Sequence, residues 1–240
     1  MIFMSIPTPT FKETCYEHYR SELVNTYPEN LDSPYMRRLI HDHIPPDRKS
    51  RICDFGCGEG RLLWILEREG YSNIEGVDRS PFQVGRRVHH AVQFGDGLEH
   101  LQRKPDSSLD VAIAFDVIEH LRPEELLQWM HELNRVLLPT GRLIIHTANG
   151  GGLFGSRSRY ADLTHDTAFT AGSLGQLAEI GGFRSIGAFE DKPVIHGLKS
   201  CLRRVVWDVC RLPFLLMWTA ETGTWRQCIL SQNILAVFYK

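Results

Sequence analysis

The apolar positions in the middle of the chain alternate between two spacings. Short continuous apolar runs are typical of strands buried on both faces of a parallel sheet, and longer stretches with helical spacing separate them. This alternation predicts an α/β fold: a Rossmann-like, doubly wound, mostly parallel sheet of seven strands covered by helices on both faces. The first five strands are expected at 51–56, 73–78, 91–96, 109–116 and 141–149, and the helices between them at 60–70, 81–90 and 123–137.

Local signals mark the ends of several predicted helices. Pro81 and Pro123 fall in the first turns of their helices, where a missing N–H does little harm, and Ser80 can cap the former. Residues 139–141, Pro-Thr-Gly, are expected to end the third of these helices and to turn into the fifth strand.

The C-terminal part of the chain predicts a delayed last strand. A helix at 173–180 leads to a sixth strand at 183–189, and the last strand is expected at 233–240. Residues 198–232 carry apolar residues at helical spacing, which indicates a helical insertion before the last strand.

The N-terminal part predicts two helices, at 11–26 and 33–43, that cover one end of the sheet. We therefore expect an N-terminal helical cover over residues 1–47 and the main domain over residues 48–240.

Composition narrows the choice of partner and compartment. The 240 residues carry a formal net charge of -2, so no broad polyanion-binding surface is indicated and no nucleic acid partner is expected. The first residues lack the features of an export signal, which predicts a cytoplasmic protein. The six cysteines are scattered without C-x-x-C pairs. They are expected to be reduced thiols that do not form a structural zinc site.

A glycine-rich turn, CDFGCGEG, follows the first predicted strand at residues 53–60. A phosphate-binding loop needs Lys and then Ser or Thr after its last glycine, but Arg61 and Leu62 stand there. A dinucleotide fingerprint needs a third glycine where Arg61 lies. Because carboxylates, Asp54 among them, flank the turn, we expect a phosphate-free nucleoside with a cationic tail.

The acid-x-G-x-G-x-G pattern of residues 54–60 resembles the first motif of class I, Rossmann-like S-adenosylmethionine-dependent methyltransferases. The segments GVD (76–78), GDGLEHL (95–101) and AFDVIEHL (114–121) resemble the family's later motifs, and Thr140 replaces one glycine of its usual L-x-P-G-G turn. The resemblance implies that S-adenosylmethionine is the cofactor, that Asp78 binds the ribose hydroxyls and that Asp96 binds the adenine amino group. The implied cofactor-binding residues are Asp54, Gly56, Cys57, Gly58, Gly60, Asp78, Arg79, Asp96, Gly97, Leu98, Phe115 and Asp116.

Three histidines lie near predicted carboxyl ends of strands, where a base would deprotonate an alcohol acceptor. His146 lies inside an apolar strand and is interpreted as structural, while His120 resembles a common family residue near the donor. His165 belongs to ADLTHDTAFT (161–170), which resembles methyltransferases of bacterial cell-surface polysaccharide and sugar biosynthesis. We take His165 as the catalytic base, oriented by Asp162, with a purely structural turn residue as the alternative.

The segment 196–225 mixes basic and apolar residues. Two interpretations stay open: contact with a membrane surface through 198–218, or a helical cap over the sheet edge or a homodimer contact. The longest uncharged apolar run, 212–218, is too short to span a bilayer. Asp116, Asp162 and Asp166 offer oxygen atoms to a magnesium ion, but they show no closed ligand spacing, so no metal ligand is assigned.

Together these patterns predict an S-adenosylmethionine-dependent methyltransferase that methylates a hydroxyl of a sugar or glycan precursor. Methylation of a quinone or phenolic small molecule is a second interpretation, because the same donor core would serve it. A non-catalytic module that binds S-adenosylmethionine as a structural ligand is a third.

Overall fold

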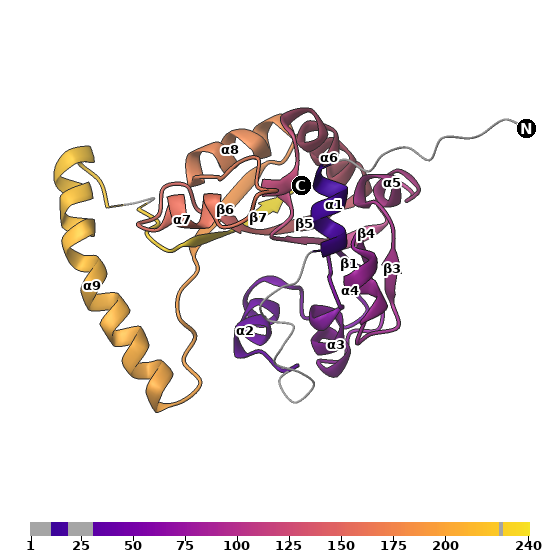
Figure 1. The fold of residues 1–240 in the computed structure, drawn as a ribbon, viewed down its shortest axis with the longest axis horizontal. Helices are drawn as coiled ribbons and strands as arrows, with labels where there is room; N and C mark the ends of the chain where they lie inside the picture. Colours follow the sequence, from indigo (N-terminus) through magenta and orange to yellow (C-terminus); the bar gives the residue numbers. More distant parts are fainter. Residues whose placement is uncertain (1–10, 19–30, 226–227) are drawn as a thin grey trace, which may run out of the picture.

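The computed structural model describes residues 11–18, 31–225 and 228–240 (Figure 1). Its centre is a seven-stranded sheet with strand order β3-β2-β1-β4-β5-β7-β6, in which β7 alone runs antiparallel to its neighbours. The predicted α/β, mostly parallel, doubly wound sheet is therefore confirmed. The strands are β1 (Ile52–Phe55), β2 (Ile74–Asp78), β3 (Val92–Phe94), β4 (Leu109–Phe115), β5 (Leu137–Ala148), β6 (Ser185–Glu190) and β7 (Asn233–Tyr239).

Helices cover both faces of this sheet, and each face has its own apolar core. Helices α5, α6 and α8 bury residues such as Leu101, Trp129 and Leu174 against one face, and α2 and α3 bury Leu39 and Leu62 against the other. The helices are α1 (Phe11–His18), α2 (Pro34–His43), α3 (Arg61–Arg68), α4 (Pro81–Gly85), α5 (Gly97–Gln102), α6 (Pro123–Val136), α7 (Gly155–Tyr160), α8 (Ala171–Ile180) and α9 (Leu198–Thr222).

Capping residues explain where two helices begin. The Ser80 hydroxyl accepts a hydrogen bond from the N–H of Gln83 at the start of α4, as the sequence predicts. Asp96 caps α5, a helix of six residues that is too short to show an apolar period and was not predicted. Helix α4 ends at Gly85 instead of reaching residue 90.

Strand β5 begins earlier than expected. Leu137 already pairs with Leu109, whereas the regular pairing with β4 starts at Arg142, opposite Val111. The Pro-Thr-Gly segment at 139–141 is therefore an irregularity inside the strand, not a turn that precedes it. A Cβ at Gly141 would lie 2.9 Å from the Leu138 carbonyl oxygen, so a residue without a side chain fits this close approach.

The two predicted N-terminal helices are found in part. The helix expected at 11–26 is present as α1, and its residues 19–26 lie outside the described residues. The helix expected at 33–43 is α2, with Ser33 as its N-cap. The two helices contact α4 and α3, respectively.

The insertion expected at 198–232 contains one long helix, α9, that stands away from the sheet (orange to yellow in Figure 1). Its outward side chains are exposed, for example Leu198 at 89% and Leu216 at 71%. A helical cap would bury such a face, so the structure does not support the interpretation of a cap over the sheet edge. None of the helices in the described part of the chain is long and apolar enough to span a membrane.

Candidate active site

A cavity of about 250 Å3 opens at the carboxyl ends of β1, β2 and β4. The strand order reverses between β1 and β4, the place where ligands bind in open α/β sheets. Three carboxylates, from Asp78, Asp96 and Asp116, line the cavity together with one guanidinium, from Arg79. The other lining residues are Gly56, Gly58, Val77, Ser80, Gln83, Gly95, Gly97, Phe115, Val117, His120, Leu121 and Trp129.

The glycine turn forms one wall of this cavity with bare main chain. Gly56 and Gly58 have φ of 73° and 55°, a left-handed conformation that side chains disfavour. A Cβ at Gly56 would lie 2.4 Å from Val117 Cγ2, so the close packing of the turn against the end of β4 requires glycine. At Gly58, which lines the cavity, the nearest atom to an added Cβ would be Gln83 Oε1 at 3.9 Å, an ordinary contact distance.

The carboxylates of Asp78 and Asp96 are fixed by backbone N–H groups. Asp78 accepts from the N–H of Gly58 at 2.8 Å and from that of Ser80 at 2.7 Å. Asp96 accepts from the N–H of Leu98 at 2.9 Å. Because a carboxylate has about four lone-pair sites, both side chains keep acceptor capacity for hydroxyl or amino groups of a ligand. Burial raises the pKa of Asp78, although its hydrogen bonds from the main chain oppose this.

Four of the predicted cofactor-binding residues do not line the cavity. Asp54 is 3% exposed within β1, and Cys57 packs against Gly76, where an added Cβ would lie 2.7 Å from its sulfur. Gly60 starts α3 and faces Val92. Leu98 packs against the apolar core, so only its main chain takes part in fixing Asp96.

Asp54 nevertheless has an unusual environment directly behind the turn. Its Oδ1 is buried and has no hydrogen-bond partner among the described residues. Burial and the nearby charge of Asp78 raise its pKa to about 8. With this pKa the carboxyl is mainly neutral near pH 7, so Asp54 is a buried polar group behind the turn and not a charge in the cavity.

Sequence reasoning missed the aromatic wall formed by Trp129. The Trp129 ring lies 5.3 Å from the Phe55 ring, and a Cβ at Gly97 would come within 2.9 Å of it. The absence of a side chain at Gly97 therefore lets the indole lie close to Asp96, where the resemblance places the adenine. An isolated tryptophan on the apolar face of a helix predicts core packing, so the sequence held no signal for this role.

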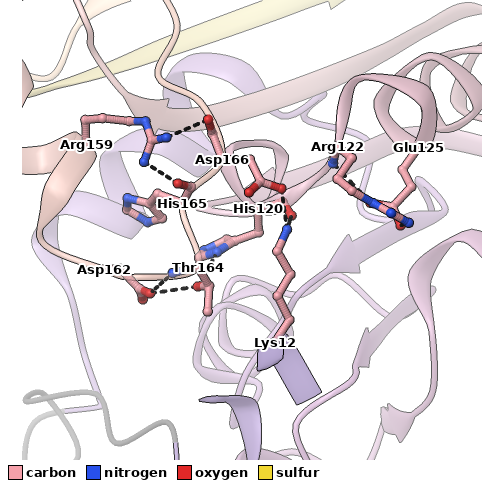
Figure 2. A network of polar contacts seen from close by, with 9 residues as sticks. All are labelled: Lys12, His120, Arg122, Glu125, Arg159, Asp162, Thr164, His165 and Asp166. Carbon is pink, nitrogen blue, oxygen red and sulfur yellow. Dashed lines mark hydrogen bonds and ion pairs between the residues drawn. The ribbon is translucent and has the colours of Figure 1, made fainter. Parts of the chain in front are cut away.

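A pair of histidines lies at the rim of the cavity (Figure 2). His120 lines the cavity, and His165 does not, but their ring centroids are 4.7 Å apart, with 64° between the ring planes. His165 Nδ1 lies 3.1 Å from the Ser158 carbonyl oxygen, which can only accept. The Nδ1 of His165 therefore carries the proton, and its lone pair is on Nε2.

Asp162 orients His120, not His165 as the sequence predicted. The Thr164 hydroxyl donates its only proton to Asp162 Oδ1 at 2.7 Å, so it accepts from His120 Nδ1 at 2.8 Å (Figure 2). This arrangement fixes the His120 tautomer that has its lone pair on Nε2. Burial and the neighbouring His165 lower the pKa of His120 to about 4, so its ring is neutral near pH 7.

Main-chain contacts hold the two histidines together although 45 positions separate them in the sequence. The N–H of Asp166 donates to the carbonyl oxygen of Glu119 at 2.8 Å, and Arg159 donates to the carbonyl oxygens of His165 and Asp166. Lys12 of α1 donates to the carbonyl oxygen of His120 at 2.7 Å. Hydrogen bonds therefore hold the loop at 161–170 against the segment that follows β4.

His146 is buried, as the sequence predicted for a structural residue. Its Nδ1 lies 2.7 Å from Asp116 Oδ1, and its Nε2 lies 3.4 Å from Asp191 Oδ2. Burial alone would lower the pKa of His146, but the two carboxylates outweigh it and raise the pKa to about 10. His146 therefore links the carboxylate of Asp116, at the cavity, to the end of β6.

The model of a family described as "Methyltransferase domain" matches residues 27–186 of the chain, more than half of its length. A probable S-adenosylmethionine-dependent methyltransferase of Mycolicibacterium smegmatis is 34% identical over 158 residues, which cover 64% of this chain and 59% of that protein. A tRNA U34 carboxymethyltransferase of Shewanella denitrificans is 25% identical over 145 residues, 55% of this chain and 43% of that protein. The chain thus spans less than two thirds of the length of these relatives.

Solved structures share the fold at low identity. A SAM-dependent methyltransferase from Archaeoglobus fulgidus aligns with a TM-score of 0.65 and 20% identity over 87% of this chain and 95% of that one. The phosphoethanolamine N-methyltransferase 2 of Haemonchus contortus, solved with S-adenosyl-L-methionine, aligns with a TM-score of 0.58 and 18% identity over 85% of this chain and 52% of that one. From the family match over residues 27–186, together with this fold, we conclude that the chain belongs to the methyltransferase-domain family, within the Rossmann-like, S-adenosylmethionine-dependent class.

Proposed function

We propose that the chain transfers a methyl group from S-adenosylmethionine to a hydroxyl group of a sugar or glycan precursor. The observation that carries this proposal is the composition of the cavity, three carboxylates and one guanidinium beside a bare glycine turn, next to a histidine pair. Such a wall favours a cationic nucleoside over a pyrophosphate.

The residues present fit S-adenosylmethionine group by group. Asp78 offers acceptor oxygens to the ribose hydroxyls, and Asp96 with the Trp129 wall offers an acceptor and a ring surface to adenine. At Gly58 bare main chain lines the cavity, and the methionine part can approach it there. When bound, S-adenosylmethionine supplies an electrophilic methyl group on a sulfonium.

In methyl transfer to a hydroxyl, a bond forms between the acceptor oxygen and the methyl carbon while the bond from carbon to sulfur breaks. The products are a methyl ether and the demethylated thioether, and the hydroxyl proton must leave. His120 lies at the cavity with its lone pair on Nε2, so this edge is where the acceptor hydroxyl loses its proton. The chain contributes alignment of the reacting atoms and exclusion of water.

A second hollow, connected to the donor cavity through His146, has room for an acceptor. It has a volume of about 530 Å3 and is lined by Tyr35, Arg38, Asp42, His43 and Asp191 among others. It is not the donor site, because it lies away from the glycine turn, but Asp191 reaches the His146 that contacts Asp116 of the cavity. Its polar side chains offer donors and acceptors to hydroxyl groups, and the apolar ones, among them Leu39 and Phe189, can contact the face of a sugar ring.

Binding and product analysis test the proposal. Calorimetry is expected to show binding of S-adenosylmethionine and of its demethylated product, with no binding of ATP or NADH. Incubation with panels of nucleotide sugars, phenols and quinones, and transfer RNA should then yield a product heavier by one methyl group only in the sugar panel. A methylated phenol, quinone or tRNA would show that the acceptor is not a sugar and would assign it to that other class. Donor binding without any turnover would favour the non-catalytic module.

We further propose that α9 rests on the cytoplasmic surface of an anionic membrane and brings the site to its acceptor. At helical spacing, one outward stripe of α9 holds only apolar side chains, and all of them are exposed. Lys199 and Arg203 border this stripe, are exposed, and form no ion pair within the described residues. The stripe comprises Leu198, Leu202, Val205, Val206, Val209, Leu212 and Leu216.

The choice of a lipid surface rests on this charge pattern. The 25 residues of α9 make a helix about 37 Å long. Its stripe can therefore lie along a bilayer surface while Lys199 and Arg203 reach acidic headgroups. The remaining arginines, Arg204 and Arg211, pair with Asp208 and Glu190 on the opposite face. A helix that packed against its own domain would bury the apolar stripe and expose the arginines.

Vesicle flotation distinguishes a membrane from a second copy of the chain. The protein should float with vesicles that contain about 30% phosphatidylglycerol, and Leu202→Asp with Val209→Asp should reduce the bound fraction at least tenfold. Ile180→Asp, an exposed apolar position on α8, is the matched control and should bind like the wild type. A dimer in light scattering that these α9 changes dissociate, without vesicle binding, would overturn the proposal.

A further inference from the structure

Glu119, His120 and His165 form a cluster of ligand-type side chains beside the donor cavity. One carboxylate oxygen of Glu119 and one ring nitrogen from each histidine all lie within 4.8 Å of one another. Two nitrogens and one carboxylate oxygen form the donor set that binds first-row divalent metals and leaves further coordination positions open. Glu119 is only 1% exposed and does not line the donor cavity, so donor binding does not explain a buried carboxyl group at this position.

The hydrogen bonds that surround the cluster also suit a metal site. Histidines that bind a metal usually donate their other ring N–H to an oxygen, which fixes the tautomer and the ring orientation. His165 does so through Nδ1 to the Ser158 carbonyl, and His120 through Nδ1 to Thr164. Both tautomers therefore carry the lone pair on Nε2.

The carboxylate is held in the same manner. Glu119 Oε2 accepts from the Thr147 hydroxyl of β5 at 2.9 Å, and a carboxylate has about four lone-pair sites, so the group keeps acceptor capacity for a metal. Its carbonyl oxygen accepts from the N–H groups of Asp166 and Thr167, so the loop with His165 is fixed to the residue that provides the carboxylate. The two adjacent ligands, Glu119 and His120, are thus positioned by β5 and by the segment after β4, and the third, His165, by the loop at 161–170.

We propose that Glu119, His120 and His165 bind one divalent transition-metal ion at the rim of the donor cavity. The metal class follows from the two imidazoles, which suit manganese, iron, cobalt or zinc better than magnesium. His120 also lines the cavity, so an open coordination position would face the place where the acceptor hydroxyl approaches. With the Nε2 lone pair of His120 on the metal, the ion would orient and acidify that hydroxyl and its proton would pass to water; this role rests on the proposed function, whereas metal binding itself does not.

Two other groups of ligand-type residues provide comparison. Cys53, Glu75 and His100 lie close together, but Lys104 already pairs with Glu75 and would compete with a cation. Glu67, His89 and His90 form a third group, in which Glu67 and His90 are exposed. Only the cluster at Glu119 adjoins the donor cavity among the described residues.

Cobalt binding tests the inference without donor or acceptor. The chain, freed of metal with a chelator, is titrated with Co2+ by calorimetry and by visible absorption. We expect one ion per chain, with d–d bands and no intense charge-transfer band from thiolate, because the three ligands contain no sulfur. A thiolate band would indicate binding at a cysteine instead and would overturn the assignment.

Variants complete the test. His165→Ala, at a half-buried position outside the donor cavity, should weaken Co2+ binding at least tenfold while the affinity for S-adenosylmethionine stays the same. Glu119→Gln, which keeps the size of the buried side chain, should do likewise, and the double variant Glu67→Gln with His90→Ala is the control that should bind as the wild type does. Unchanged Co2+ affinity in His165→Ala, or no binding at all in the wild type, would refute the metal site even if methyl transfer is observed.

Discussion

At the scale of single residues, the site depends on side chains whose partners lie far away in the sequence. Asp78 is fixed by the N–H of Gly58, 20 positions earlier, and His120 by Thr164, 44 positions later. Residue types and spacing reveal which groups are chemically able to act. They do not reveal which of two histidines a given carboxylate orients, because that depends on the path of the loop.

Asp78→Asn should weaken binding of S-adenosylmethionine at least tenfold. The amide has one acceptor oxygen in place of two, and its NH2 group would face either a main-chain N–H or a ribose hydroxyl. Calorimetry measures the change in affinity. Glu99→Gln is the control, since Glu99 is exposed on α5 and pairs with Arg103 away from the cavity. Equal affinities of the Asp78→Asn variant and the wild type would show that Asp78 does not contact the ligand.

At the scale of elements, the positions of the strands and of most helices along the chain followed from the sequence, and the exceptions have physical causes. The apolar runs predicted all seven strands because a strand buried on both faces must be apolar throughout. Helices α5 and α7 have six residues each, too few to produce an apolar period, and the bulge at residues 139–141 depends on the pairing of β4 with β5. Pairing register is a property of two strands and is not visible in one.

His146 connects three elements, and its titration makes their attachment dependent on pH. The imidazole contacts Asp116 after β4 and Asp191 after β6, and the Tyr35 ring of α2 lies 6.1 Å away. The pKa of His146 rises from an unfolded value near 6.5 to about 10 in the folded chain. The folded state therefore binds the extra proton between these values, and this stabilisation is complete below pH 6.5 and is lost as the pH rises toward 10.

Urea unfolding of the wild type and of His146→Gln at pH 6 to 10 measures this contribution. The difference in the free energy of unfolding between the two should shrink with rising pH, by about 1 kcal/mol between pH 7 and 9, since Asp116 is 59% exposed and solvent screens the pair. Because both proteins share every other titrating group, a difference that stays constant or grows with pH would contradict the charged state of His146.

At the scale of the whole molecule, the donor cavity and the two proposed surfaces differ in how far the sequence could predict them. The glycine turn and the acids at strand ends converge because parallel strands end at one edge of the sheet. The outward orientation of α9 could not be predicted, because helical spacing shows that one face is apolar and does not show which way it points. The cluster of Glu119, His120 and His165 likewise needs the fold, since its third member lies 45 positions beyond the second.

Because the cavity joins the turn after β1 to β2, β4 and α6, a bound donor should stabilise the fold as a unit. At a concentration one hundred times its Kd, S-adenosylmethionine should add about 2.7 kcal/mol to the free energy of unfolding. For a chain of this size that corresponds to a rise in Tm of about 5–10 °C, measurable by calorimetry or dye fluorescence. ATP and NADH at the same concentrations should leave Tm unchanged, because the three carboxylates of the cavity oppose their phosphates. A larger rise with either nucleotide would assign the cavity to a phosphate-bearing ligand, and with it the proposed methyl transfer would have to be abandoned.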